Sequence, residues 1–576
     1  MKLIHRYLPA ALLLLTMGTA CKKYVDVSNP DTLTDPAYWR NENSVRTYNW
    51  EFYNEFPGFG NGSSLNGDFY FTTLNDDQTP SSFTTFAANA PANSTDWTNS
   101  TTTLSSSGVP TYYLLSFGYI RKANIMLDRV DLASMDDASK SHWKGVARFF
   151  RAWTYFKLVQ EYGGVPWYSH AVDIGDSTNV YKPRDTHQLV MDSVLADLNF
   201  AVANLRTVDQ VNTVNRDVAL ALKARVCLWE GTYRKYHTEL NMPNADQYLQ
   251  AAKDASNTLI TSGAYTLAKS YQTAYNSEDL GADKSEVLLY KRYDAGVLMH
   301  SLIAYLYSTT IINGPSKSAI ESYLCTDGKP ITLSPLYQGD ASLNAVKSNR
   351  DLRLGITIDT NHYAYAGAAY NSLSSSTGYR PIKWLPDTIK IKSYPLQIST
   401  NTSDAPLFWL AEVYLIYAEA AAELQDMGKY TLTQADLDAT INKLRARGNV
   451  APLTIAYLQD PANADPKKDA DVSATIWEIR RERRVELMMD GFRYQDLMRW
   501  KKGSYFNSTT NPDSWLGAKV PANPKVLLNA AGYIMPYAAS TVRSFVDPKN
   551  YLSPIPTNQI LLYPPAIQAT MQNPGW

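Results

Sequence analysis

Residues 474–491 read ATIWEIRRERRVELMMDG, and this stretch shows most directly how the chain folds. Apolar residues recur at helical spacing between charged ones over the range 472–490, which predicts a helix. Gly491 follows as a residue that commonly ends a helix. Because acidic and basic side chains share its faces, this helix is expected to meet other helices through charged groups.

Three carboxylates recur every four residues along this helix, at Glu478, Glu482 and Glu486. A glycosidase needs two acids on facing walls of a cleft, and neighbours on one helix face cannot straddle a substrate. Glu478 with Arg481, and Arg483 with Glu486, lie three residues apart and can pair within the helix or bridge to adjoining helices. We therefore interpret the stripe as a structural ion-pair network.

Helical periodicity also extends along much of the remaining chain, often in pairs joined by short loops. Alanine-rich faces at 219–224 and 418–422 allow neighbouring helices to approach closely. Stacked pairs of this kind predict a mainly α fold, a degenerate tetratricopeptide-like scaffold without an evident 34-residue period. The predicted helices are Tyr112–Val130, Asp137–Glu161, Thr186–Leu205, Arg216–Tyr233, Ala245–Ser262, Leu407–Met427 and Gln434–Arg447.

Two long irregular regions, 57–110 and 310–400, interrupt the helices and are rich in Gly, Ser, Thr, Asn, Pro and aromatic residues. Loops this long within a compact protein usually carry function. The sequence thus predicts a helical scaffold that presents large loops.

The composition excludes several classes of protein. Fifty-five acidic and 54 basic residues among 576 leave one net negative charge, so no global basic field exists to hold nucleic acid. Tyrosine is in excess, at 40 residues, with 13 tryptophans beside it. These side chains suit wet binding surfaces as well as cores. Trp39, Trp50, Trp153, Trp229, Trp477 and Trp500 lie on helical patterns and are expected in the core.

The amino terminus has the pattern of an export signal. Basic residues precede the apolar run LPAALLLL at 8–15, which is too short to span a membrane. Small residues then precede Cys21, a pattern that resembles a bacterial lipoprotein signal of residues 1–20 with lipidation at Cys21. An ordinary secretory signal with an incidental cysteine is the alternative. Cys227 and Cys325 do not make a disulfide framework, and Cys227 is expected to be a small buried residue.

Seven segments in order resemble the SusD/RagB family of Bacteroidetes outer-membrane lipoproteins, over a span from Cys21 to Trp576. They are CKKYVDVSNPDTLTDPAYWRNENS (21–44), RFFRAWTYFKLVQEYGGVPW (148–167), YLCTDGKPITLSPLYQGD (323–340), NRDLRL (349–354), LAEVYLIYAEAA (410–421), RRERRVELMMDGFRYQDLMRW (480–500) and the terminal YLSPIPTNQILLYPPAIQATMQNPGW.

The resemblance implies a tetratricopeptide-like scaffold with a loop-rich face. It also implies a lipid-anchored protein on the extracellular side of the outer membrane, which captures oligosaccharides above a SusC-like TonB-dependent transporter. Residues 21–235 would form an amino-terminal region with helical repeats and a loop insertion, and 236–576 would complete the same compact unit.

Aromatic residues in loops are the better candidates for contact with a sugar, because sugar C–H faces pack on aromatic planes while hydroxyls need polar partners. Asn93, Asp96 and Trp97 lie together in the polar stretch NSTDW. Binding by this trio competes with simple packing of Trp97 under the loop.

A second candidate cluster comprises Tyr271, Tyr275, Arg292, Tyr293 and Asp294. Strand alternation in EVLLYKRYDA would place Leu289, Lys291 and Tyr293 on one face, with Tyr290, Arg292 and Asp294 on the other. The family's ligand face draws on roughly these regions. Tyrosines that pack between helices are an equally simple interpretation.

Patterns for catalysis or a cofactor are missing from the sequence. The seven histidines show no close pair with metal-ligand spacing, and no nucleophile elbow or phosphate loop occurs. Asp76 and Asp77 could help to bind a structural calcium ion, although a solvated loop turn is the simpler expectation.

The sequence therefore predicts a non-enzymatic, lipid-anchored protein that binds oligosaccharides and requires no cofactor. Three alternatives remain: a relative that binds peptides, a secreted glycoside hydrolase, and a purely structural surface protein. The hydrolase would need a pair of acids on facing cleft walls, and the sequence shows no such pair.

Overall fold

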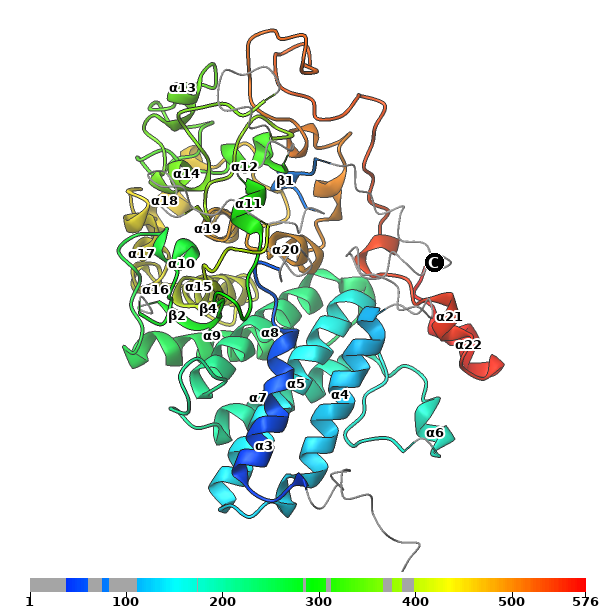
Figure 1. Cartoon of the computed structure of the whole chain (residues 1–576). Coiled ribbons are helices and arrows are strands. Elements are labelled where there is room, and N and C mark those ends of the chain that lie inside the picture. The colour runs from blue at the N-terminus through cyan, green and yellow to red at the C-terminus, as the bar shows by residue number, and fades with distance from the viewer. Residues whose placement is uncertain are drawn as a thin grey trace, which may run out of the picture.

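The computed structural model describes residues 38–60, 75–81, 111–173, 175–282, 286–306, 312–365, 375–385 and 398–576. Within these ranges helices dominate, and the only sheets have two short strands each. The predicted mainly α class is confirmed. Figure 1 shows the helices of the first half of the chain at one end and the shorter helices with long loops at the other. No described helix is both long enough and apolar enough to cross a membrane.

The longer helices match the predicted ranges closely. Their ends are set by local chemistry, since Asp136, Thr186 and Asn215 each accept a backbone N–H from the first turn of the helix that follows. Ala245–Ser262 ends at Gly263, whose φ of 66° favours glycine. The longer helices are α3 (Glu42–Asn49), α4 (Thr111–Arg129), α5 (Asp137–Tyr162), α7 (His187–Asn204), α8 (Arg216–Tyr236), α9 (Ala245–Ser262), α15 (Leu410–Asp426) and α19 (Ala474–Glu486).

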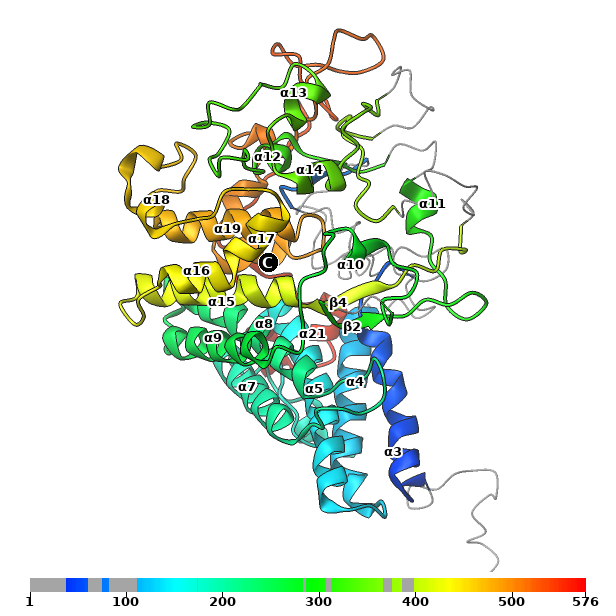
Figure 2. The same ribbon diagram turned by 90° about the vertical axis from the view of Figure 1, so that its left-hand side faces the viewer.

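Helices α4, α5, α7, α8, α9 and α15 pack in sequence, each against the next. Figure 2 shows α15 lying between the layer of α8 and α9 and the layer that contains α19. The alanines at 418, 420, 421 and 422 are fully buried in α15, as are those at 219, 221 and 224 in α8. These small side chains allow the close helix contacts that the sequence predicted.

The second half of the chain consists of shorter helices joined by long loops. They are α10 (Thr273–Asn276), α11 (Leu302–Leu306), α12 (Lys317–Glu321), α13 (Leu343–Lys347), α14 (Leu352–Thr357), α16 (Gln434–Ala439), α17 (Ile441–Arg447), α18 (Ile455–Gln459), α20 (Arg493–Arg499), α21 (Thr557–Ile560) and α22 (Pro565–Met571); α6 (Ser177–Val180) precedes them. The sheets pair β1 (Gln78–Thr79) with β3 (Gly314–Pro315), and β2 (Val287–Lys291) with β4 (Ala405–Trp409).

Three predicted helices differ from the structure. The range 407–409 belongs to strand β4, because these residues pair with β2 before α15 begins at Leu410. The helix predicted over 434–447 breaks at Thr440, whose ψ of −90° is not helical. The third, α19, ends at Glu486 rather than at Asp490, and the chain turns through Met489, which has a φ of 63°.

Candidate ligand-binding face

Strand β2 ends in an exposed turn that projects two charged side chains from the protein. Arg292 is 67% exposed and Asp294 is 47% exposed, and the Arg292 Nε lies 2.9 Å from the Asp294 Oδ2. The turn is closed by the Asp294 N–H, which donates to the Leu298 carbonyl over 2.8 Å. A guanidinium and a carboxylate held side by side offer the donors and acceptors that a hydroxyl-rich ligand requires.

Tyr293 points the other way, into the protein, as the predicted strand alternation requires. Its hydroxyl donates to the Gly60 carbonyl over 2.7 Å and accepts the Phe59 N–H over 2.9 Å. Its ring is stacked on Phe59, and the ring of His300 meets it edge-on at 4.7 Å. A Cβ at Gly58 would lie 2.6 Å from the Tyr293 hydroxyl, so only glycine permits this approach. Tyr293 thus fixes the segment before residue 61 to the β2 turn.

Asp404 fixes the other side of the same turn. One carboxylate oxygen accepts the Tyr293 N–H over 2.9 Å, and the other accepts the Leu280 N–H over 3.0 Å. Burial raises the pKa of Asp404 to about 6, although both hydrogen bonds favour its charged form. Burial lowers the pKa of His300 to about 3, so this imidazole stays neutral beside Tyr293.

Tyr271 and Tyr275 are also interior residues. The Tyr271 hydroxyl donates to the Glu486 carbonyl over 2.7 Å, and that of Tyr275 donates to the Asp490 carboxylate over 2.9 Å. The Lys383 ammonium lies 4.0 Å above the Tyr275 ring and 2.8 Å from the Asp490 Oδ1. These contacts join α10 to the end of α19.

The three tyrosines of the predicted cluster therefore do not form a surface on which a ligand could stack. Tyr271, Tyr275 and Tyr293 are at most 2% exposed, and each hydroxyl is used within the protein. Packing, the alternative that the sequence left open, describes their role. Only Arg292 and Asp294 of this cluster lie where a ligand can touch them.

The acidic stripe of α19 forms the predicted ion-pair network. Arg353 Nη1 lies 2.7 Å from both Glu482 Oε1 and Glu486 Oε2, and Arg445 is 3.2 Å from both Glu478 and Glu482. The Glu478–Arg481 pair exists at 3.3 Å, whereas Arg483 pairs with Asp496 at 2.8 Å instead of with Glu486. All three glutamates are buried, so no polysaccharide could reach them.

Asp76 and Asp77 correct the prediction of a solvated loop turn. Both side chains are fully buried, where the Arg493 Nε is 2.6 Å from Asp76 and the Arg484 Nε is 2.8 Å from Asp77. Burial raises the pKa of both carboxyl groups, but the two arginines outweigh it at Asp76, whose pKa is lowered to about 2, whereas burial prevails at Asp77 and raises its pKa. The described residues include no group of three or more His, Cys, Asp or Glu placed to hold a metal ion.

Comparison with known proteins places this architecture in a family. A model of the SusD family matches residues 307–576, and a second model, described as starch-binding associating with outer membrane, matches residues 65–228. The chain belongs to the SusD/RagB family. It is 23% identical over 400 residues to the SusD-like protein P38 of Formosa agariphila, an alignment that covers 67% of this chain and 71% of that protein. A SusD-like protein of Bacteroides ovatus is 24% identical over 422 residues, which cover 70% and 68% of the two chains.

Solved SusD structures share the fold over nearly the whole chain. A SusD-like carbohydrate binding protein from Bacteroides fragilis superposes with a TM-score of 0.68 at 20% identity, covering 92% of this chain and 99% of the other. A second SusD-like protein from that organism gives a TM-score of 0.65 at 19% identity, with coverages of 94% and 99%. At these identities the similarity establishes the SusD-like fold.

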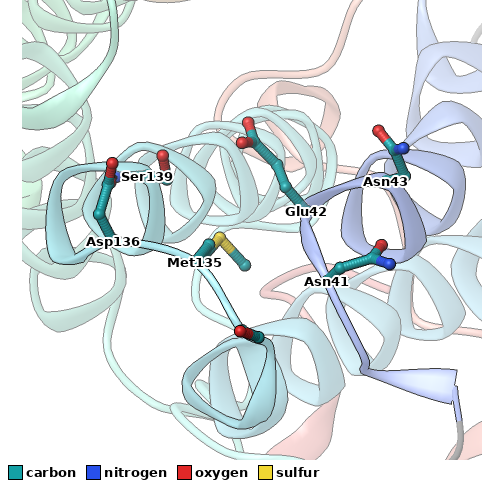
Figure 3. Close-up of a pocket in the computed structure, with 7 residues that line it drawn as sticks. Asn41, Glu42, Asn43, Met135, Asp136 and Ser139 are labelled. Carbon is teal, nitrogen blue, oxygen red and sulfur yellow. The ribbon is translucent and has the colours of Figure 1, made fainter.

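A pocket of 380 Å³ lies at the amino-terminal end of α3 (Figure 3). Asn41, Glu42 and Asn43 line one side, and Ser134, Met135, Asp136 and Ser139 line the other. The Glu42 carboxylate already accepts hydrogen bonds from Arg206, over 2.7 Å, and from the Trp143 indole, over 3.1 Å. Glu42 thus holds α3 to α5, and the second carboxylate of the pocket, that of Asp136, accepts the Ser139 N–H at the start of α5 over 2.6 Å, so both acidic groups are already hydrogen-bonded within the protein.

Several sequence-predicted positions fall outside the described residues of this SusD/RagB chain. They are the lipidation site Cys21 with its signal segment 1–20, and the trio Asn93, Asp96 and Trp97. Cys227 and Cys325 are buried free thiols, and Cys227 is fully buried in α8 as predicted. Four of the six tryptophans expected in the core are buried, but Trp477 is partly exposed and Trp50 is 43% exposed.

Proposed function

We propose that this chain is a non-enzymatic, cell-surface lipoprotein that captures oligosaccharides and delivers them to a SusC-like TonB-dependent transporter. Membership of the SusD/RagB family is the observation that supports nutrient binding most strongly, since one matching model is described as starch-binding and outer-membrane-associated. A structural neighbour is itself named a carbohydrate binding protein.

The arrangement of the described residues suits capture at the β2 turn. Arg292 and Asp294 project outward, while Tyr293 and Asp404 fix the backbone between and beside them. A rigid base lowers the entropy lost on binding, so a modest number of contacts suffices. Asn93, Asp96 and Trp97 complete the proposed ligand-binding set.

Tethering accounts for delivery without tight binding. A lipid on Cys21 and an interface with the transporter would together retain the protein at the outer membrane, because two weak anchors hold where one does not. Capture beside the transporter raises the effective concentration of the glycan at its entrance. The proposed function includes no hydrolysis, because the α19 glutamates are buried in ion pairs.

Peptide binding is the second candidate, and one observation favours it. Burial of Tyr271, Tyr275 and Tyr293 leaves a charged pair, rather than aromatic rings, as the exposed part of that cluster. Charged side chains are typical of peptide recognition.

A screen of the purified chain without residues 1–21 against a glycan array and a peptide library distinguishes the two candidates. Saturable binding to oligosaccharides, without binding to peptides, is the expected result. Binding to peptides alone would overturn the oligosaccharide proposal. Co-purification of the full chain with a TonB-dependent transporter from outer membranes tests the delivery step, and its consistent absence would argue against that partner.

A further inference from the structure

Trp50 is an exposed aromatic side chain at the junction of α3 and the short 3₁₀ helix η1 (Trp50–Glu55). It is 43% exposed, whereas most other described tryptophans are buried. Among the residues that the structure describes, its indole N–H has no hydrogen-bond partner. Exposing so large a ring gives up the free energy that its burial would provide.

The 3₁₀ geometry of η1 aligns two different rows of side chains. Residues three apart eclipse one another in such a helix, so Trp50 lies over Tyr53 and Glu51 over Asn54. The Trp50 and Tyr53 rings are 5.4 Å apart and tilted by 49°. An aromatic row therefore runs beside a polar row, and the Asn54 amide is exposed to solvent.

Tyr53 gives the aromatic row a rigid base. Its hydroxyl accepts the Val214 N–H over 2.8 Å, and its ring meets Phe150 edge-on at 5.2 Å. Trp50 thus rests against a ring that is itself fixed to the core. A stacking plane held in this way loses little conformational entropy when a ligand binds.

The loop 205–215 connects the aromatic row to strand β2. Tyr53 holds this loop at Val214, and Asn212 holds it to β2 by two hydrogen bonds with the Tyr290 backbone, of 2.9 and 3.0 Å. The Lys291 ammonium of β2 also donates to the carbonyl of Phe56, the residue after η1, over 3.2 Å. The 3₁₀ helix that carries Trp50 is therefore joined through this loop to β2, the strand that leads into Arg292 and Asp294.

Three pairs of opposite charge lie around this surface. Glu51 bonds to Lys122, Arg46 lies 3.0 Å from Asp209, and Arg292 pairs with Asp294 at 2.9 Å. Because each of these charges is offset by its neighbour, the three pairs do not favour an anionic ligand. An uncharged ligand with apolar faces and many hydroxyl groups fits an aromatic row bordered by amide and paired charges.

We propose that Trp50 is the stacking platform for a ring of a neutral oligosaccharide, with Asn54 and Glu51 contacting its hydroxyls. This inference rests on the proposed function and adds to it a binding residue and a ligand class. It also supplies the aromatic surface that the buried tyrosines do not provide.

The test uses the chain without residues 1–21 and its variants Trp50→Ala, Trp50→Phe and Tyr181→Ala. Tyr181 is a matched control, because it is an aromatic residue 39% exposed that contacts Tyr563, next to α21 rather than α3. A glycan array with neutral, uronate and sulfated oligosaccharides first identifies what the unmodified chain binds. Calorimetry with the best neutral glycan then measures each variant, and thermal unfolding confirms that each is folded.

Trp50→Ala is expected to weaken binding about tenfold, Trp50→Phe to weaken it less, and Tyr181→Ala to leave it unchanged. Addition of saturating glycan should also change the tryptophan fluorescence of the unmodified chain, and the change should be smaller in Trp50→Phe, which lacks the Trp50 indole. If Trp50→Ala binds as well as the unmodified chain, the platform is overturned while oligosaccharide capture stands. Selection of charged glycans alone would overturn the neutral ligand class, and binding to no glycan would overturn both proposals.

Discussion

The hydroxyl of Tyr293 donates to the carbonyl of Gly60 over 2.7 Å, although the two residues are 233 positions apart in the chain. The bond connects the β2 turn to the segment that precedes residue 61, and the Phe59 N–H donates to the same hydroxyl. A residue that the sequence suggested for ligand contact thus positions the backbone of the ligand-binding face.

Removal of this hydroxyl should destabilise the protein. Tyr293→Phe leaves the buried Gly60 carbonyl and Phe59 N–H without their partner, which should lower the free energy of unfolding by about 1–3 kcal/mol. Urea unfolding measures the change. Tyr290→Phe is the control, since the Tyr290 hydroxyl has no hydrogen-bond partner among the described residues. Equal stabilities of the two variants would contradict this role.

The buried arginine of the α19 network should matter more than the exposed arginine of the turn. Arg353→Met leaves Asp351, Glu482 and Glu486 buried without their common cation, and should cost about 3–5 kcal/mol of stability. Arg292→Met, which removes an exposed pair, should cost about 0–1 kcal/mol. Chemical denaturation measures the free energy of unfolding of both variants. Similar losses of stability would show that burial does not determine how much these ion pairs contribute.

Stability should fall in acid because of His300. Its pKa is lowered from 6.5 to about 3 by burial, so below pH 6.5 the unfolded chain takes up a proton that the folded chain does not. The free energy of unfolding should therefore decrease as the pH falls from 6.5 towards 3, by at most about 1.4 kcal/mol per pH unit. The His300→Gln variant lacks this titrating group, so its free energy of unfolding should decrease less over the same pH range. Parallel pH profiles of the two proteins would contradict the assignment.

Replacement of the exposed pair should weaken ligand binding without unfolding the protein. Arg292→Ala and Asp294→Ala each remove hydroxyl partners, and we expect each to reduce glycan affinity by about three- to tenfold. Their melting temperatures should stay near that of the unmodified chain, because the pair is exposed. Unchanged glycan affinity in the double variant would show that Arg292 and Asp294 are not part of the ligand-binding site.

Cys21→Ser tests the lipid anchor. The full chain should fractionate with outer membranes and incorporate a labelled fatty acid, and the variant should do neither. Membrane association of the unlabelled variant at the level of the unmodified chain would show that another feature retains the protein.

The helices of this fold could be predicted from sequence because their signals are local. The range Ala245–Ser262 was predicted without error, since its periodicity ends at Gly263, whose positive φ stops the helix. Strand β4 was missed because Leu407–Trp409 forms one apolar run with α15, and its partner β2 lies more than a hundred residues earlier. Periodicity alone does not separate a short buried strand from a buried helix.

Exposure of single side chains could not be predicted in the same way, because it depends on distant partners. Tyr293 is buried through Gly60, and Asp76 and Asp77 are buried because Arg493 and Arg484 reach them from more than 400 residues away. Trp50 lies on a helical pattern that resembles those of buried tryptophans, but it occurs where α3 tightens into η1 and faces outward. The family and the fold were thus evident from sequence, whereas the exposed aromatic residue required the structure.

Calorimetric titration of the chain without residues 1–21 tests the central claim most directly. The titrants are neutral oligosaccharides of increasing length and, separately, a mixed peptide library. Oligosaccharide capture predicts saturable binding that strengthens with glycan length as more rings meet the face, with no binding of peptides. Saturable binding of peptides, with no binding of any oligosaccharide, would contradict it.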